Sequence, residues 1–253
     1  MPDAPDGPEP GGIVGVVAPA GAPAPVVLGY DDGPEPGGTD RVLAELQRAG
    51  VTATFFVLLT RVRRHPGLLA ETVDAGHDVA LHGADHVRPT DLDPRVLADR
   101  LRGAKEALED AVQVPVRWYR PPYGAQSPRT WQAAVDLGLT PVLWSLHLDD
   151  WRAGTDEQRL SGLRAAAGTG HVVLAHDGFA GLDDGVDDGP APQLDRGLLT
   201  RRLLAACAEK GWHPLSLADA VAAGHELVRR PWPLPAGPVP GLRADPRPTP
   251  RPR

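Results

Sequence analysis

Two adjacent carboxylates and two nearby histidines are the residues of this chain whose types and spacing most directly suggest chemistry. Asp31 and Asp32 end an apolar run at residues 26–30 and precede a Gly-Pro turn, which can direct both carboxylates toward one site. His82 and His86 are separated by three residues, a spacing that lets two imidazoles reach one ion. Two histidines with one carboxylate form a metal-ligand set that leaves positions open for water and substrate. The alternatives are a solvated turn and two unrelated surface histidines.

Three further segments contain groups suited to proton transfer or charge stabilisation. Arg120 opens the sequence Arg-Pro-Pro-Tyr-Gly, where it can pair with a catalytic carboxylate while the stiffened chain presents a backbone N–H to an oxyanion. Asp150 precedes Trp151, and His176 closes another apolar run. A histidine that faces an aspartate at a metal site is a candidate proton donor. The ordinary alternatives are a surface arginine in a proline-ordered loop and a structural histidine.

The elements that must position these residues follow from the hydrophobic pattern, in which short apolar runs alternate with amphipathic segments. We expect strands at residues 26–30, 54–58, 77–81, 116–119, 141–144, 171–175 and 214–216. We expect helices at residues 39–49, 68–75, 94–111, 128–137, 157–167, 198–210 and 217–223. Such repeated units form a parallel sheet covered by helices, either open or closed into a barrel. Functional residues then gather at the carboxyl ends of the strands, where Asp31, His82, Arg120, Asp150 and His176 all fall.

Composition and charge narrow the possible partners. The 253 residues are enough for one large domain with a sizeable core, and Cys207 is the only cysteine, which excludes an internal disulfide. The net charge of −7 disfavours nucleic acid as the main partner. No stretch approaches the roughly 20 apolar residues that cross a bilayer, and the first 25 residues do not resemble a signal peptide. We therefore expect a cytoplasmic protein without a membrane partner; its oligomeric state is left open.

Proline and glycine are concentrated at the two ends of the chain. Residues 1–25 are rich in Pro, Gly and Ala and are expected to form a loose arm, although residues 13–17 could add one edge strand. Residues 224–253 are rich in Pro and Arg and are expected to form a disordered tail. Residues 26–223 would then form the catalytic domain.

The polar segments resemble, in their order and spacing, the five motifs of the polysaccharide deacetylase family, also described as the NodB-homology domain or carbohydrate esterase family four. The matching residues are Asp31, Asp32, Gly33 and Pro34 in the first motif, His82 and His86 in the second, Arg120, Pro122 and Tyr123 in the third, Asp150 and Trp151 in the fourth, and Leu174 and His176 in the fifth. The resemblance covers residues 26–223. It implies an α/β fold, a distorted (β/α) barrel that is commonly seven-stranded, with the site at the carboxyl ends of the strands.

The resemblance also implies a metal centre. Asp32, His82 and His86 would hold one divalent ion, Zn²⁺ by preference, with Co²⁺ or another transition metal as alternatives. Trp151 and Leu174 would bind substrate by shaping a pocket for the acetyl methyl group.

The remaining motif residues acquire catalytic roles from the same resemblance. Asp31 would be the general base, and Arg120 would tune it. Tyr123 would contact the substrate and offer its backbone N–H to the oxyanion. His176 would be the general acid, with Asp150 setting its protonation.

Three positions depart from the family pattern. Gly83 replaces the usual Ser or Thr of the second motif, whose hydroxyl normally steadies that loop. Tyr30 replaces a Phe, and His147 stands where many members have an earlier Asp of the fourth motif. None of these changes removes a ligand or a proton-transfer group, so they bear on the substrate more than on the chemistry.

The implied function is a metal-dependent hydrolase of non-peptide carbon–nitrogen bonds with a role in carbohydrate metabolism. It would remove an acetyl group from an N-acetylated amino sugar or related small molecule, by attack of metal-bound water with Asp31 as base and His176 as acid. One alternative is a hydrolase of a non-sugar amide, cyclic amide or ureide; a second is a non-catalytic sugar- or metal-binding protein. We expect a small molecule or oligosaccharide as substrate rather than an insoluble polymer.

An acidic, glycine-containing segment at residues 183–189 follows the fifth motif. It could act as a lid over the site, bind a second cation, or be a solvated loop, which is the commonest case for such a sequence. Its position makes it a candidate for setting substrate specificity.

Overall fold

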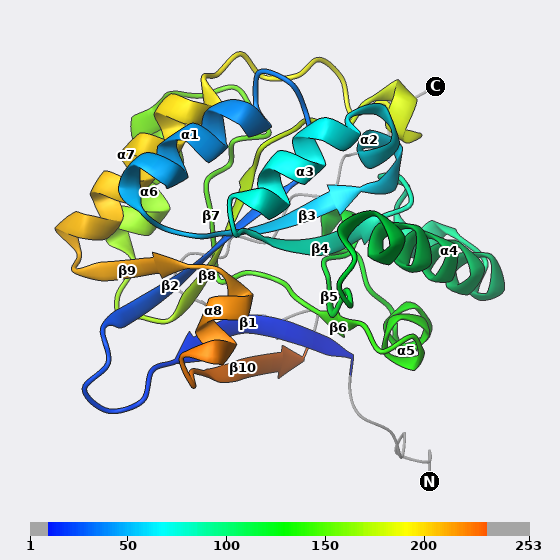
Figure 1. Ribbon diagram of the computed structural model, residues 1–253, viewed down its shortest axis with the longest axis horizontal. Helices are drawn as coiled ribbons and strands as arrows, with labels where there is room; N and C mark the ends of the chain where they lie inside the picture. Colours follow the sequence, from blue (N-terminus) through cyan, green and yellow to red (C-terminus); the bar gives the residue numbers. More distant parts are fainter. Residues whose placement is uncertain (1–9, 232–253) are drawn as a thin grey trace, which may run out of the picture.

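The computed structural model describes residues 10–231, in which a ten-stranded sheet curls between surrounding helices (Figure 1). Helices α1, α6 and α7 lie together on one side of the sheet, and α4 and α5 lie together on another. Within these residues no helix is long and apolar enough to cross a membrane.

The strands are β1 (Gly11–Val17), β2 (Ala24–Asp31), β3 (Thr54–Leu58), β4 (Asp78–Gly83), β5 (Trp118–Tyr119), β6 (Thr140–Pro141), β7 (Leu146–His147), β8 (His171–His176), β9 (Trp212–Leu215) and β10 (Glu226–Pro231). The helices are α1 (Thr39–Ala49), α2 (Leu59–Arg64), α3 (Pro66–Asp74), α4 (Pro94–Val112), α5 (Pro128–Asp136), α6 (Asp156–Ala165), α7 (Arg196–Glu209) and α8 (Leu217–Ala222). Three single 3₁₀ turns occur at Pro89–Asp91, Pro122–Gly124 and Leu182–Asp184.

Local signals explain where most helices begin and end. The side chains of five N-cap residues accept a backbone N–H of the following turn, namely Asp93, Ser127, Thr155, Asp195 and Ser216. Gly50 ends α1 in the left-handed region at φ 65°, a conformation that glycine adopts without steric cost. The sequence pattern did not predict α2, because it follows β3 with no turn residue between them.

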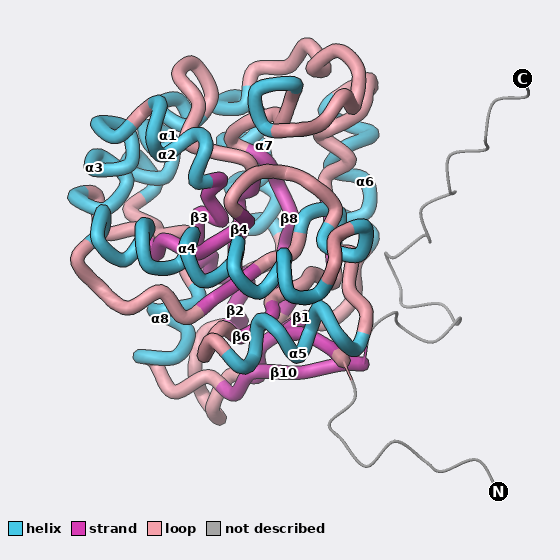
Figure 2. Tube along the Cα trace, turned by 90° about the vertical axis from the view of Figure 1, so that its right-hand side faces the viewer, coloured by secondary structure: helices cyan, strands magenta, loops and turns pink. Residues whose placement is uncertain are grey.

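The sheet has the order β10-β1-β8-β2-β3-β4-β5-β6, with β7 paired to β8 and β9 paired to β2. The core strands are parallel, as repeated strand–helix units require. A bridge between Ile13 of β1 and Val142, just after β6, joins two distant parts of this path, so the sheet curls into a distorted barrel with helices outside it (Figure 2). The expected barrel is confirmed, but the path contains eight strands rather than seven.

The additional strands correct both expected domain boundaries. β1 lies inside the segment expected to be a loose arm, residues 1–25, and β10 lies inside the expected tail, residues 224–253. The two strands pair antiparallel, from Gly11 opposite Pro231 to Val17 opposite Glu226. The apolar run in β1 is short, but it buries Ile13, Val14 and Val16, which stabilises the strand in the sheet. Residues 1–9 and 232–253 of the arm and tail lie outside the described residues.

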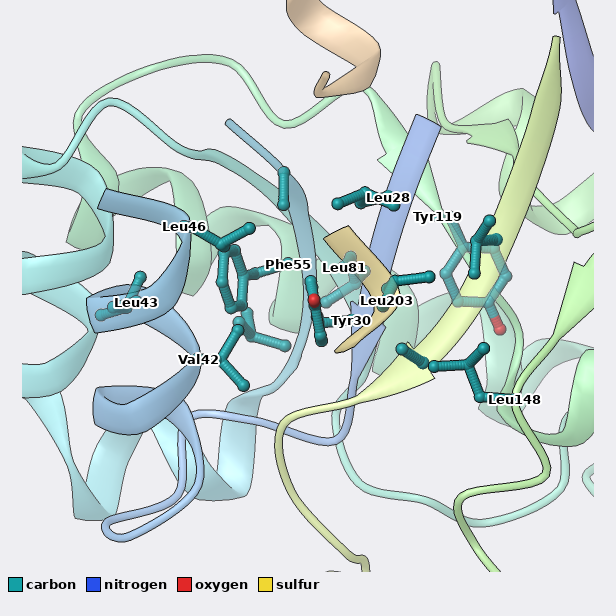
Figure 3. Close-up of a cluster of buried hydrophobic side chains, with 14 of the residues drawn as sticks. Leu28, Tyr30, Val42, Leu43, Leu46, Phe55, Leu81, Tyr119, Leu148 and Leu203 are labelled. Atoms are coloured by element: carbon teal, nitrogen blue, oxygen red, sulfur yellow. The ribbon is translucent and has the colours of Figure 1, made fainter. Parts of the chain in front are cut away.

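The main apolar core lies between the sheet and its helices (Figure 3). Tyr30 of β2 stacks on Phe55 of β3 with ring centroids 5.4 Å apart, and Val42 and Leu46 of α1 belong to the same cluster. Burying one such side chain contributes about 1.5–3 kcal/mol. The Tyr30 hydroxyl is 3.1 Å from that of Thr200 in α7, so the departure from Phe is accommodated by a hydrogen bond inside the core.

Candidate metal centre and active site

Asp31 and His176 lie side by side at the ends of β2 and β8. Gly29 pairs with Leu174 and Asp31 pairs with His176 in the parallel register, so all four residues are on one face of the sheet. Val27, two residues before Gly29 on the same face of β2, belongs to a second apolar cluster inside the curled sheet. The strand alternation therefore brings both polar side chains to the open end of the barrel interior.

Asp32, His82 and His86 converge on one point next to this pair. The Nε2 atoms of both histidines lie 3.4 Å from Oδ1 of Asp32, and one ligand atom from each residue lies within 4.8 Å of the others. Oδ1 of Asp32 is buried and has no hydrogen-bond partner among the described residues. Because an unpaired buried carboxylate oxygen is costly, these three residues fit a divalent metal ion that would bind between them.

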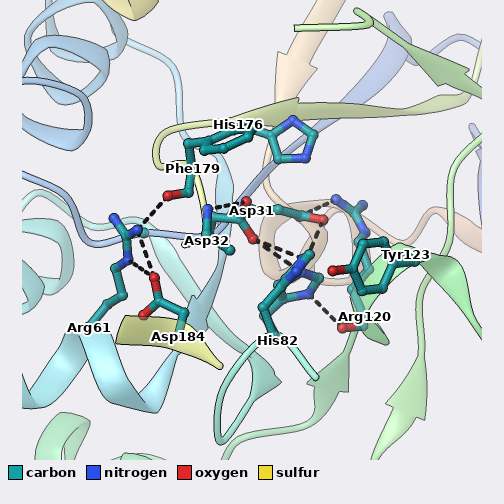
Figure 4. A network of polar contacts seen from close by, with 12 residues as sticks. Asp31, Asp32, Arg61, His82, Arg120, Tyr123, His176, Phe179 and Asp184 are labelled. Atoms are coloured by element: carbon teal, nitrogen blue, oxygen red, sulfur yellow. Dashed lines mark hydrogen bonds and ion pairs between the residues drawn. The ribbon is translucent and has the colours of Figure 1, made fainter. Parts of the chain in front are cut away.

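Neighbouring atoms orient these candidate ligands (Figure 4). Nδ1 of His82 lies 2.7 Å from the carbonyl oxygen of Arg120, an acceptor that keeps the proton on Nδ1 and leaves the Nε2 lone pair facing Asp32. Asp32 has φ 74°, a left-handed conformation that is uncommon outside glycine and occurs at functional sites. Burial alone would raise the pKa of Asp32, but without a metal the positive charge that His86 and His82 carry when protonated holds it well below its usual range. Asp32 is therefore an ionised carboxylate, as a metal ligand must be.

Arg120 is completely buried and fixes the orientation of Asp31. Its Nη1 donates to Oδ1 of Asp31 at 2.7 Å, and its Nη2 donates to the carbonyl of Leu143 at 3.2 Å. The guanidinium lies over Gly29, where an added Cβ would approach Nη2 to 2.6 Å, so only glycine fits there. Oδ2 of Asp31 is left 3.9 Å from Nε2 of His82, beside the metal cluster.

His176 forms an ion pair with Asp150. Its Nδ1 is 2.7 Å from Oδ1 of Asp150, and its backbone N–H donates to Oδ2 at 2.8 Å. Burial alone would lower the pKa of His176, but the attraction of Asp150 outweighs it and raises the pKa to about 9. Arg196 of α7 donates to the His176 carbonyl at 2.8 Å and lies 3.6 Å from Asp150. The imidazole is therefore protonated at neutral pH, as a general acid must be.

Tyr123 is held in a strained backbone conformation close to the candidate metal ligands. Its φ of 61° and ψ of 10° place a residue other than glycine in the left-handed region. The Tyr123 and His86 rings have centroids 4.4 Å apart, and the Tyr123 hydroxyl donates to Asp188 at 2.7 Å. The role of its backbone N–H as an oxyanion donor stays a prediction.

The two residues expected to shape the acetyl pocket lie next to His176. The Trp151 ring is 5.4 Å from the His176 ring at 66°, and 5.5 Å from that of His147. Leu174 is buried two residues before His176 on the same face of β8. His147 therefore contacts Trp151, an aromatic side chain of the site, rather than the candidate metal ligands.

Sequence reasoning missed Asp177, which supports the turn that follows Asp31 and Asp32. Asp177 is completely buried, and it accepts the Gly33 N–H at 3.1 Å and the Thr39 hydroxyl at 2.5 Å. A Cβ added to Gly33 would approach Asp177 to 2.0 Å, so this turn requires glycine. Burial raises the pKa of Asp177 to about 7. Its only sequence signal was its position directly after His176.

Part of the acidic segment at residues 183–189 is buried and paired. Asp184 is 1% exposed and forms an ion pair with Arg61 at 2.8 Å and another with Arg64. Because two arginines neutralise it, Asp184 is not available to a second cation. Asp183 is 85% exposed at its side chain, so the expectation of a solvated loop holds for that residue and is wrong for Asp184.

Known proteins are similar in sequence and in structure to much of this chain. A family model described as polysaccharide deacetylase matches residues 19–142. A chitooligosaccharide deacetylase from Bradyrhizobium sp. is 36% identical over 155 residues, which are 61% of this chain and 71% of the relative. The peptidoglycan-N-acetylglucosamine deacetylase PgdA of Listeria monocytogenes is 34% identical over 152 residues, 60% of this chain and 32% of the relative. A solved family 4 carbohydrate esterase from Streptomyces lividans, in complex with acetate, has a TM-score of 0.65 and 26% identity, covering 76% of this chain and 93% of its own.

The chain therefore belongs to the polysaccharide deacetylase family, as its motifs predicted. It spans about a third of the length of the Listeria relative. The family match ends at residue 142, before Asp150 and His176, whose assignment rests on the motif resemblance and on their geometry.

Proposed function

We propose that this chain is a metal-dependent deacetylase that hydrolyses the N-acetyl bond of an acetylated amino sugar. One observation carries the proposal: Asp31, paired with Arg120, and His176, paired with Asp150, lie beside one cluster of metal-ligand residues. Hydrolysis of an amide needs a base for the attacking water and an acid for the departing amine. Relatives named as deacetylases of chitooligosaccharides and of peptidoglycan N-acetylglucosamine support the same chemistry.

We propose Zn²⁺ as the resident metal, with Co²⁺ as a working substitute. Asp32, His82 and His86 would hold it, because three protein ligands of this kind are typical of catalytic zinc sites that keep a position open. When bound, a divalent ion polarises an amide carbonyl and lowers the pKa of water.

Asp31 would act as the base. Its Oδ1 is engaged by Arg120, so Oδ2 is the oxygen that accepts the proton of the attacking water. Since the guanidinium is itself held by the Leu143 carbonyl, the carboxylate cannot turn away from the site. The backbone N–H of Tyr123 would donate to the oxygen on which negative charge develops.

His176 would act as the acid. Its Nδ1 is engaged by Asp150, so Nε2 is the atom that donates a proton to the amine as the carbon–nitrogen bond breaks. Arg196 holds this pair from α7 and keeps the imidazole at the end of β8. An amine leaves poorly without that proton, so the reaction depends on both residues.

We propose a soluble acetylated oligosaccharide as the substrate. Tyr123 beside His86 and Trp151 beside His176 supply aromatic surface next to both halves of the site, which suits the apolar faces of sugar rings. The net charge of −7 would also repel anionic polymers at low salt.

Acetate release over a panel of substrates tests the proposal. The panel contains N-acetylglucosamine, short acetylated chitooligosaccharides, chitin, peptidoglycan, and cyclic amides and ureides. We expect release from the oligosaccharides, and release at least about 100-fold slower with the Asp31→Asn or His176→Ala variant. Turnover of cyclic amides or ureides alone would favour the non-sugar hydrolase, and sugar binding without turnover would show a non-catalytic protein.

A further inference from the structure

The segment between β8 and α7, residues 177–195, contacts the candidate metal ligands Asp32 and His86. Three contacts connect residues 183–189 of this segment to His86 and Tyr123. The backbone N–H of His86 donates to the carbonyl of Asp184 at 2.9 Å. The Tyr123 hydroxyl donates to Oδ2 of Asp188 at 2.7 Å, and the same Oδ2 lies 3.7 Å from Nδ1 of His86.

We propose that Asp188 is a positioning residue, which orients the His86 ring as a metal ligand and holds Tyr123 beside it. The inference rests on the proposed function, since it concerns the same metal site. It assigns a specific task to one carboxylate of an acidic segment that the five motifs do not include.

The two histidines show why an acceptor is needed at this position. Both present Nε2 to Asp32 at 3.4 Å, so each must keep its proton on Nδ1 to bind a metal. The carbonyl of Arg120 meets Nδ1 of His82 at 2.7 Å. Nδ1 of His86 is buried without a hydrogen-bond partner among the described residues, and the Asp188 carboxylate is the acidic group that faces it. A carboxylate behind a metal-binding imidazole fixes both its tautomer and its ring orientation.

Asp188 also contacts Tyr123, whose backbone N–H is the proposed donor to the oxyanion. The ring of Tyr123 contacts the His86 ring, with centroids 4.4 Å apart, and the guanidinium of Arg88, 4.1 Å from the ring centroid. Its backbone is held in the left-handed region. The hydrogen bond to Asp188 fixes the far end of the side chain, so one carboxylate constrains both a metal ligand and the proposed oxyanion donor.

The segment has a separate anchor, which makes Asp188 testable by itself. Asp184 accepts from Nε and Nη2 of Arg61 at 3.0 and 2.8 Å, and from the Thr60 hydroxyl at 2.8 Å (Figure 4). Its side chain is 1% exposed, whereas that of Asp188 is 38% exposed. Substituting Asp188 therefore removes the contact with the site and leaves the buried anchor in place.

Metal binding to the full chain tests the inference without relying on turnover. Zn²⁺ affinity and the visible spectrum of the Co²⁺-loaded protein are measured for Asp188→Asn. We expect about a 10-fold loss of Zn²⁺ affinity and an altered Co²⁺ spectrum, because a supporting carboxylate is lost. In a Tyr123→Phe background the additional loss should be smaller, since the two groups act through one contact.

Asp187→Asn is the matched control. It makes the same charge change in the same segment, at a carboxylate that accepts from the backbone N–H of Gly189. We expect its Zn²⁺ affinity to stay within about two-fold of the unsubstituted chain, and its Co²⁺ spectrum to be unchanged.

The possible outcomes distinguish a failure of the role proposed for Asp188 from a failure of the proposed function. Equal affinities and spectra for Asp188→Asn and Asp187→Asn would overturn the inference and leave the metal site intact. Failure of the unsubstituted chain to bind Zn²⁺ or Co²⁺ would contradict the proposed function and the inference together. Melting temperatures of the metal-free variants are measured as well, and a fall in Asp188→Asn that accounts for its affinity loss would show a merely structural role.

Discussion

At the scale of single residues, Asp31 and Asp32 are neighbours in sequence but have different surroundings. Arg120 engages one oxygen of Asp31, whereas the left-handed conformation of Asp32 turns its carboxylate between His82 and His86. These surroundings make Asp31 suited to proton transfer and Asp32 suited to binding a cation.

The substitution Asp31→Asn tests this division of roles. It removes the proton acceptor and leaves all three metal ligands, so kcat should fall by at least about 100-fold while Zn²⁺ affinity is retained. Asp32→Asn is the matched comparison and should lose metal instead. Loss of metal in Asp31→Asn, with metal retained in Asp32→Asn, would show that the two roles are exchanged.

The pair of His176 and Asp150 gives a prediction about pH. An NMR titration of the metal-free chain should find His176 with a pKa of about 9, so that the imidazole loses its proton as the pH rises through that value. In Asp150→Asn the main attraction is removed and burial is largely unopposed, so the pKa should fall toward or below its ordinary value of about 6.5.

The same pair also predicts a pH-dependent stability difference. A pKa raised in the folded chain stabilises it fully below the unfolded pKa of about 6.5, and this contribution is lost as the pH rises through about 9. Urea unfolding should therefore show the largest deficit of Asp150→Asn near pH 6 and a much smaller one above pH 9. An unchanged His176 pKa in the variant would contradict both expectations.

At the scale of the elements, the departure at Gly83 has a steric cause. An added Cβ would approach the backbone oxygen of Asp85 to 2.5 Å, so the loop between β4 and His86 takes a tight course that the usual Ser or Thr could not follow. Gly83→Ala should lower the free energy of unfolding by about 1–3 kcal/mol, and weaken Zn²⁺ binding through His86.

Gly103→Ala is the control for that change. Gly103 is exposed in α4 and an added Cβ there meets no atom within 4 Å, so the variant should gain about 0.5–1 kcal/mol. A Gly83→Ala variant as stable as the unsubstituted chain would show that the loop can relax.

The hydrophobic pattern predicted the regular elements well, because their periods repeat over several residues. α1 and β3 have the boundaries that the pattern predicts. Of the strand expected at residues 141–144, only Pro141 lies in a strand, β6; Val142 forms an isolated bridge with Ile13, and β7 begins only at Leu146. That bridge joins residues far apart in sequence, and no local pattern encodes it.

The pairing of β10 with the edge of β1 leads to a prediction about stability. A chain ending at residue 225 lacks β10 and leaves the outer edge of β1 unpaired, whereas a chain ending at residue 231 retains the pairing. At roughly 0.5–1.5 kcal/mol for each of a few lost ladder bonds, the shorter chain should be less stable by about 2 kcal/mol and melt about 4–8 °C lower. Equal melting temperatures would show that β10 contributes nothing to the barrel.

At the scale of the whole molecule, the sequence predicted the residues of the site better than the contacts that support them. The motif segments were recognisable because each ends or closely follows a strand, and parallel strands end at one edge. Asp177, Asp184 and Asp188 were not, because each acts through a partner far away in sequence: Thr39, Arg61 and Tyr123, respectively. Only the folded chain brings these pairs together.

We propose that Asp32, His82 and His86 hold a metal ion that hydrolysis of the acetyl group requires. The most direct measurement is acetate release from a short acetylated chitooligosaccharide, using protein stripped of metal and then titrated with Zn²⁺ or Co²⁺. We predict no release from the stripped chain, and recovery that saturates at one metal ion per chain and is absent in His82→Ala. Full release from exhaustively metal-free protein would contradict the proposed requirement for a metal ion.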